Sequence, residues 1–156
     1  MPNTQAIGVA FADPEFQSVA VTGAVSAASA SVTGAVSAGS VSATTVTASG
    51  SLVVKSATVA AAGSTQGNAA AIAAGFTLVT AADGTKGVIL PAASAGLVVI
   101  IKNADAANAI LKVYPASGDA INAIAADSPY SMAAKTSMLL VAYDATTWYT
   151  VPLLAS

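Results

Sequence analysis

One low-complexity stretch constrains the fold of this chain most strongly. Residues from Val19 to Val59 are almost all Val, Ala, Ser, Thr or Gly, and the heptapeptide Val-Thr-Gly-Ala-Val-Ser-Ala occurs at Val21–Ala27 and again at Val32–Ala38. Side chains this small and polar bury too little apolar surface to form a core of their own. The stretch is therefore expected to gain its order from identical neighbouring chains, as in a fibrous, self-associating protein.

The spacing of valine in this stretch indicates short strands rather than a helix. The gaps between Val32 and Val46 are four or five residues, which is neither a heptad nor a sustained helical stripe. Thr and Val favour strands, and four glycines supply turns, whereas glycine at every third position, the mark of collagen, is absent. We expect short strands and tight turns, wound with two other chains into a trimeric shaft. A flexible Ser/Ala linker is the alternative.

Charge is sparse throughout the chain. Only 8% of the 156 residues are charged, against about 25% in typical soluble domains. The cations are five lysines with no arginine, and the net charge of −2 excludes the clustered positive surface that binds nucleic acid. No window of eighteen apolar residues is present, so no transmembrane helix is expected. An alanine-rich surface with so few charges favours assembly with other chains.

Composition changes along the chain and divides it into four segments. An arm containing two phenylalanines precedes the repeats, and a Gly/Ala-rich junction follows them. Within the junction, a short helix around Asn68–Ala74 and an extended connection are equally compatible with the residues. The predicted organisation is an N-terminal arm, a repetitive β shaft, a junction and a C-terminal knob, at residues 1–18, 19–60, 61–75 and 76–156.

Phe11 and Phe16 are two of the three phenylalanines of the chain, and both lie in the arm. Aromatic side chains are enriched at interfaces and also in cores. The arm therefore either docks onto another protein through these two rings or caps the first repeat.

The C-terminal segment alternates apolar runs with turn residues. Eight short strands at about ten-residue spacing are typical of an all-β sandwich or small barrel. The continuous apolar runs Val98–Ile101 and Met138–Val141 are expected in strands that are covered on both faces. The expected strands are Phe76–Thr80, Val88–Leu90, Leu97–Lys102, Ile110–Tyr114, Ala120–Ile124, Tyr130–Met132, Ser137–Tyr143 and Thr147–Val151.

No motif of catalysis, metal binding or cofactor binding is found in the sequence. The chain has no His and no Cys, which excludes Ser-His-Asp and Cys-His catalysis and the usual zinc sites. Gly84-Thr-Lys-Gly87 is typical of a hairpin turn and lacks the phosphate-loop pattern. Four carboxylates could meet in space, but all lie in predicted turns, where Asp bonds its own backbone: Asp105, Asp119, Asp127 and Asp144. We therefore expect no enzyme, no metal and no cofactor.

Three aromatic residues lie close together in the sequence near the C-terminus: Tyr143, Trp148 and Tyr149. They are candidates for packing in the core or at a threefold interface, because the sole Trp of a domain poor in aromatics is usually its packing anchor. The alternative is that they stack on a sugar.

The C-terminal region resembles a β-rich module of structural proteins from tailed bacteriophages and prophages. The resemblance covers about residues 65–152 and is clearest in Val-Tyr-Pro-Ala-Ser-Gly-Asp (113–119) and Thr-Trp-Tyr (147–149). The valine-rich repeats are similar to the shafts of phage fibres. The resemblance implies a virion protein that forms a homotrimer, and it transfers no catalytic residue.

The function expected from these observations is capsid decoration, by a cement protein or short head fibre on the exterior of the virion. Its partners would be two sister chains and the major capsid protein, with Phe11 and Phe16 as candidate docking residues. A tail-associated fibre or adhesin that binds a host glycan is the alternative, and an exposed Trp148 would favour it. A surface-binding or ice-binding repeat protein is a third hypothesis, which the irregularity of the repeats disfavours.

Overall fold

The computed structural model describes residues 22–26, 28–73 and 75–151. Phe11 and Phe16 lie outside the described residues. The chain divides into two compact units, with the boundary between Thr47 and Ala48. Each unit is described by itself.

The repetitive segment is exposed along its whole described length. Every described residue between Thr22 and Lys55 is exposed, and none of them lies in a strand. A Cβ atom built on any of its four glycines would meet no atom within 4 Å. The short strands expected here are therefore not formed between Thr22 and Lys55 in the described part of the single chain.

The second unit is built from ten strands and one short 3₁₀ turn, so the all-β prediction is confirmed. Strands β1, β3, β5, β9, β10 and β7 form a six-stranded sheet in that order, and β2, β4, β6 and β8 form a four-stranded sheet. The strand bounds are β1 (Ser56–Ala60), β2 (Ala70–Ala71), β3 (Phe76–Thr80), β4 (Gly87–Ile89), β5 (Val98–Asn103), β6 (Leu111–Tyr114), β7 (Ala120–Ile121), β8 (Tyr130–Met132), β9 (Ser137–Ala142) and β10 (Thr147–Val151).

The first six strands are arranged like the coils of a β-solenoid. The chain alternates between the two sheets, and β1, β3 and β5 are parallel neighbours in one sheet while β2, β4 and β6 are parallel neighbours in the other. Ser56 pairs with Phe76, and Phe76 pairs with Ile100, so successive coils take 20 and then 24 residues. Each coil adds one strand to each sheet, which extends the core between them.

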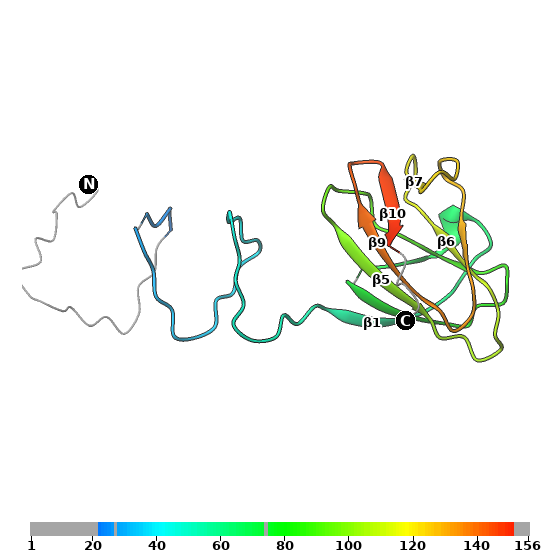
Figure 1. The fold of residues 1–156 in the computed structure, drawn as a ribbon, viewed down its shortest axis with the longest axis horizontal. Helices are drawn as coiled ribbons and strands as arrows, with labels where there is room; N and C mark the ends of the chain where they lie inside the picture. The colour runs from blue at the N-terminus through cyan, green and yellow to red at the C-terminus, as the bar shows by residue number, and fades with distance from the viewer. Residues whose placement is uncertain (1–21, 27, 74, 152–156) are drawn as a thin grey trace, which may run out of the picture. The chain divides into compact units, whose positions relative to one another are not determined.

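Antiparallel strands complete the unit. Strand β8 pairs with β6, β9 pairs with β5, and β10 pairs with β9, all antiparallel, while β7 lies parallel to β10 at the edge of the larger sheet. Figure 1 shows β5, β9 and β10 running side by side, with β7 beyond β10. The solenoid-like coils are therefore followed by strands that add to both sheets.

The strands expected from the sequence agree closely with those observed. All eight are present, and β3, β8 and β10 have the expected bounds. The alternative of a helix around Asn68–Ala74 is wrong: Gln66–Asn68 forms a single 3₁₀ turn, and β2 follows at Ala70. The Asn68 side chain accepts hydrogen bonds from the Thr65 backbone and hydroxyl, both at 2.9 Å, which holds the turn. Strands β1 and β2 lie in the ranges expected to form the end of the shaft and the junction.

One hydrophobic core lies between the two sheets. Ile101 and Leu140 of the larger sheet and Leu111 and Val113 of the smaller sheet are fully buried in it. Burial of each such side chain contributes about 1.5–3 kcal/mol. The core extends from the first coil, at Ala61, to the last strand.

Gly87 lies where two coils approach each other closely. A Cβ atom there would lie 2.7 Å from the Lys112 backbone oxygen and 2.7 Å from a ring carbon of Tyr114. Its backbone N–H donates to the carbonyls of Ala62 and Gly63, at 3.1 and 3.2 Å. Only glycine lets the backbone of β4 approach its neighbours this closely.

Candidate functional site

Trp148 lies on the inner face of β10, between β9 and the edge strand β7, and is fully buried. Its neighbours in register are Ala142 on β9 and Ile121 on β7. The indole Nε1 is buried and has no hydrogen-bond acceptor among the residues that the structure describes. Trp148 therefore acts as a packing residue and presents no stacking surface to a ligand.

Tyr143 and Tyr149 are placed on the outside of the same region. Tyr143 is 71% exposed and Tyr149 is 48% exposed. Their rings meet edge to face, with centroids 5.9 Å apart and planes at 75°. Of the three aromatic candidates, the structure thus brings these two together on the surface and separates them from Trp148. An exposed aromatic pair of this kind is a common element of binding surfaces.

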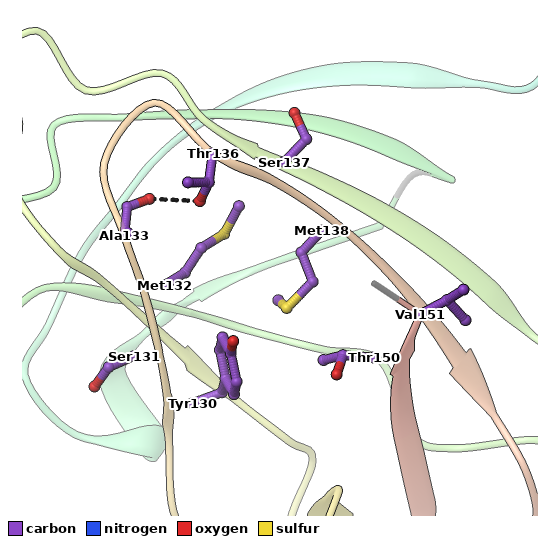
Figure 2. Close-up of a pocket in the computed structure, with 9 residues that line it drawn as sticks. All are labelled: Tyr130, Ser131, Met132, Ala133, Thr136, Ser137, Met138, Thr150 and Val151. Atoms are coloured by element: carbon purple, nitrogen blue, oxygen red, sulfur yellow. Dashed lines mark hydrogen bonds between the residues drawn. The ribbon is translucent and has the colours of Figure 1, made fainter. Parts of the chain in front are cut away.

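A hollow of about 290 Å³ opens between β8 and the paired strands β9 and β10 (Figure 2). The thioethers of Met132 and Met138 extend into it, and the Thr136 hydroxyl donates to the Ala133 carbonyl at 2.7 Å. Its lining offers hydroxyl, thioether and apolar groups but no carboxylate, ammonium, imidazole or thiol. The lining residues are Tyr130, Ser131, Met132, Ala133, Thr136, Ser137, Met138, Thr150 and Val151.

The four carboxylates singled out in the sequence bond to nearby backbone. Asp105 accepts from the Ala109 N–H at 3.1 Å, and the buried Asp119 accepts from the Ala93 N–H at 2.8 Å. Asp127 accepts from the Gly118 N–H at 2.7 Å. Within the described ranges, no three acidic, His or Cys residues gather to hold a metal ion. These side chains fix loops, as Asp does commonly in turns.

Two turns share one device, an Asp followed two residues later by Thr: the turn from β3 to β4 and the β9–β10 hairpin. The hairpin expected at Gly84–Gly87 is wrong, because β3 and β4 belong to different sheets. Asp83 accepts from the backbone N–H groups of Lys86 and Thr85 and from the Thr85 hydroxyl, at 2.7–2.9 Å. These bonds, that from the Lys86 backbone first, hold the pKa of Asp83 well below its ordinary range. The backbone N–H of Thr146 likewise lowers the pKa of Asp144.

We therefore expect the stability of the fold to depend on pH mainly in the acid range. The pKa values of Asp83, Asp127 and Asp144 are lowered in the folded state, so their contribution is present above the ordinary Asp pKa of about 3.9 and is lost as pH falls through the folded values. The chain has no His to titrate near pH 6. We expect thermal melts to coincide between pH 7 and 5 and the midpoint to fall below about pH 4.

Replacing Asp127 by Asn provides the control for this dependence, because it removes one carboxylate whose pKa the Gln66 amide and the Gly118 backbone lower. The variant should show a shallower loss of midpoint below pH 4 than the unmodified chain. A step in the midpoint between pH 7 and 5 would contradict the assignment, since no described side chain with a lowered pKa titrates there.

Residues 113–119, one of the two motifs that resemble phage structural proteins, connect the third coil to the first through hydrogen bonds. The Tyr114 hydroxyl donates to the Ser64 carbonyl at 2.9 Å, and the Pro115 carbonyl accepts from the Gln66 side chain at 3.0 Å. Gly118 has φ of 85°, which lets the chain turn so that Asp119 reaches the Ala93 N–H. The motif is thus explained by packing between coils.

Asn103 is a buried polar residue that sequence reasoning did not identify. Its side-chain amide donates to the carbonyls of Ala109, Met132 and Ala133, at 3.0, 3.4 and 3.3 Å, and its oxygen accepts from the Asp105 N–H at 3.2 Å. The side chain is fully buried at the end of β5. The signal in the sequence is a lone amide two residues after the apolar run Val98–Ile101.

No protein-family model, curated protein or solved structure matches this chain. Among the described residues, no helix has the length and hydrophobicity needed to cross a membrane.

Proposed function

We propose that this chain is a structural protein of a tailed bacteriophage that decorates or cements the exterior of the capsid, as a short head fibre or cement protein. In this proposal it works as a homotrimer. The repetitive segment forms a shaft with two sister chains, and the C-terminal β unit forms a knob.

The observation that carries the proposal is the exposure of the large apolar side chains of the repetitive segment. Valines and leucines of the segment are between 51% and 88% exposed, at Val25, Val32, Val36, Val41, Val46, Leu52, Val53 and Val54. A monomer that leaves so many large apolar side chains in water lacks the burial that stabilises folded chains. Contact with sister chains or with a capsid surface would supply it.

The proposed place in a virion rests on two sequence motifs, residues 113–119 and 147–149. The Val-Tyr-Pro-Ala-Ser-Gly-Asp and Thr-Trp-Tyr segments resemble those of phage structural proteins, and the structure gives both a packing role in the β unit. The arm with Phe11 and Phe16 is assigned to docking on the major capsid protein. Stabilisation of a capsid would then add over many copies, each binding only the assembled state.

Immunogold electron microscopy of virions tests the proposal. Antibodies raised against the purified chain would be applied to virions from the bacterium that carries the gene, with serum pre-adsorbed on the chain as the control. We expect gold particles distributed over the head. Virions that carry no label on any part would overturn the proposal.

A tail-associated fibre that binds a host glycan is the second candidate. The exposed Tyr143–Tyr149 pair favours it, because sugars stack on aromatic faces, whereas the burial of Trp148 counts against it. Gold confined to the tail in the same experiment would select this candidate instead.

A further inference from the structure

The hollow shown in Figure 2 lies beside the last described residues of the chain. Thr150 and Val151, which end β10, form part of its lining, and β8 and the start of β9 form most of the rest. The thioethers of Met132 and Met138 extend into it, and its lining carries no charged group. A cavity of about 150 Å³ accepts a benzene ring, so a hollow of about 290 Å³ has room for two apolar side chains.

Strand β9 extends past the described end of its partner β10. The two strands pair as far as Val151 opposite Leu139, whereas β9 begins two residues earlier, at Ser137. After Val151 the sequence continues with Pro-Leu-Leu-Ala-Ser, residues 152–156, which lie outside the described residues. An antiparallel ladder that continued in the same register would bring these residues alongside the start of β9.

Side-chain alternation selects which of these residues would face the hollow. Trp148 and Thr150 of β10 point inward, and the residue between them points outward. The same period of two directs Pro152 and Leu154 inward, to the side of the hollow, and Leu153 outward. Two apolar side chains would then enter the space between β8 and β9.

A proline at position 152 fits this ladder. The Thr147 carbonyl accepts from the Tyr143 N–H at 2.8 Å, so the odd-numbered residues of β10 form the hydrogen-bonded pairs with β9. The N–H of Thr150 points away from β9 and donates to the Asn122 side chain at 3.0 Å. The nitrogen of Pro152 would likewise point away from β9, where its missing N–H costs no hydrogen bond of the ladder.

We propose that the hollow is the docking site of the chain's own residues 152–155, which extend β10 along β9 and bury Pro152 and Leu154 beside the two thioethers. The occupant follows directly after Val151, and three residues of extended chain span about 10 Å, so no second chain is needed to supply it. The docked segment closes one end of the hydrophobic core and removes an uncharged apolar run from water. The inference concerns the single chain and does not rest on the proposed homotrimer.

Disulfide formation tests the register, because the chain has no cysteine of its own. Thr136 is exposed and lies opposite position 154 when the β9–β10 register is continued. Directly opposite residues in a non-hydrogen-bonded pair have Cβ atoms about 4.5 Å apart, close to their separation in a disulfide. In a buffer with oxidised glutathione, we expect Thr136→Cys/Leu154→Cys to lose its free thiols to a disulfide within one chain. The matched Thr136→Cys/Leu153→Cys should react about tenfold more slowly, since its Cβ vectors point apart.

Non-reducing electrophoresis separates the alternative occupants. A disulfide closed within one chain, formed faster with Leu154→Cys than with Leu153→Cys, supports the proposal. Disulfides that join two chains would mean that the segment of a sister chain occupies the hollow, and equal rates for the two variants would mean that the segment stays outside it. Either result overturns the proposal.

Thermal melts of the full chain provide a second measurement without cysteine. Leu154→Ser removes an inward apolar side chain and should lower the melting midpoint by about 4–8 °C, whereas Leu153→Ser should lower it by less than about 2 °C. Equal midpoints for the two variants would contradict the proposed docking. Neither measurement depends on the place of the protein in a virion, so gold labelling of the head would still support the proposed function.

Discussion

Replacing Trp148 by Ala is expected to lower the free energy of unfolding of the β unit by about 3–5 kcal/mol. The indole is fully buried between β9 and β7, and its removal leaves a cavity that the surrounding strands fill only in part. A domain of this size is typically stable by about 5–15 kcal/mol, so the variant should be marginal or unfolded at 37 °C. Urea denaturation followed by far-ultraviolet circular dichroism at fixed chain concentration measures the change, because the substitution removes the only Trp.

Trp148→Phe is the matched control. It keeps an aromatic ring in the core and removes the buried Nε1, which has no acceptor among the described residues. We expect its cost to stay below about 2 kcal/mol, since no satisfied hydrogen bond is lost. If the alanine variant cost no more than the phenylalanine variant, Trp148 would not anchor the core.

Replacing Asn103 by Asp is expected to destabilise the unit by about 3–5 kcal/mol at pH 7, although the two side chains have nearly the same shape. The amide nitrogen donates to three backbone carbonyls, and a carboxylate oxygen in its place would face the same three oxygens with a negative charge. Burial would raise the pKa of the new carboxyl group. The deficit should therefore shrink as pH falls from the raised folded pKa to the ordinary Asp pKa of about 3.9, and stay constant below it, because the neutral acid restores one donor.

Asn108→Asp controls for the added charge, because Asn108 is exposed and belongs to the turn after β5. Urea titrations of both variants at pH 7 and at pH 4 give the comparison. Equal stability of the two variants at pH 7 would show that the bonds of Asn103 do not hold the end of β5.

The strands were predictable from sequence because each is a local pattern. Runs such as Phe76–Thr80 and Thr147–Val151 combine β-branched or aromatic residues with turn residues at both ends, and the structure places strands there. Strand β1 falls in the range where short strands were expected, but its bounds were not predicted, because Ser-Ala-Thr-Val-Ala has the same composition as the exposed repeats before it. Its strand is set by pairing with β3, which is a tertiary effect.

The parallel, solenoid-like arrangement was not predictable in the same way. Pairing partners and register depend on contacts between residues 20 or more apart, and no local pattern specifies them. The continuous apolar runs did indicate strands with two apolar faces, but they gave no indication that one face would remain open in the single chain. Tyr143 and Tyr149 were found from the sequence as a cluster with Trp148. Strand alternation, which sends Trp148 inward and Tyr149 outward, separates them.

The mass of the unmodified chain in solution tests the central claim, that this is a self-associating structural protein. Light scattering after size exclusion measures it without a reference standard. One chain is 14.9 kDa, and the account predicts a stable species of about three times that mass at micromolar concentration. A single species of 14.9 kDa would contradict it, because the exposed apolar side chains of the repetitive segment would then have no sister chain to cover them.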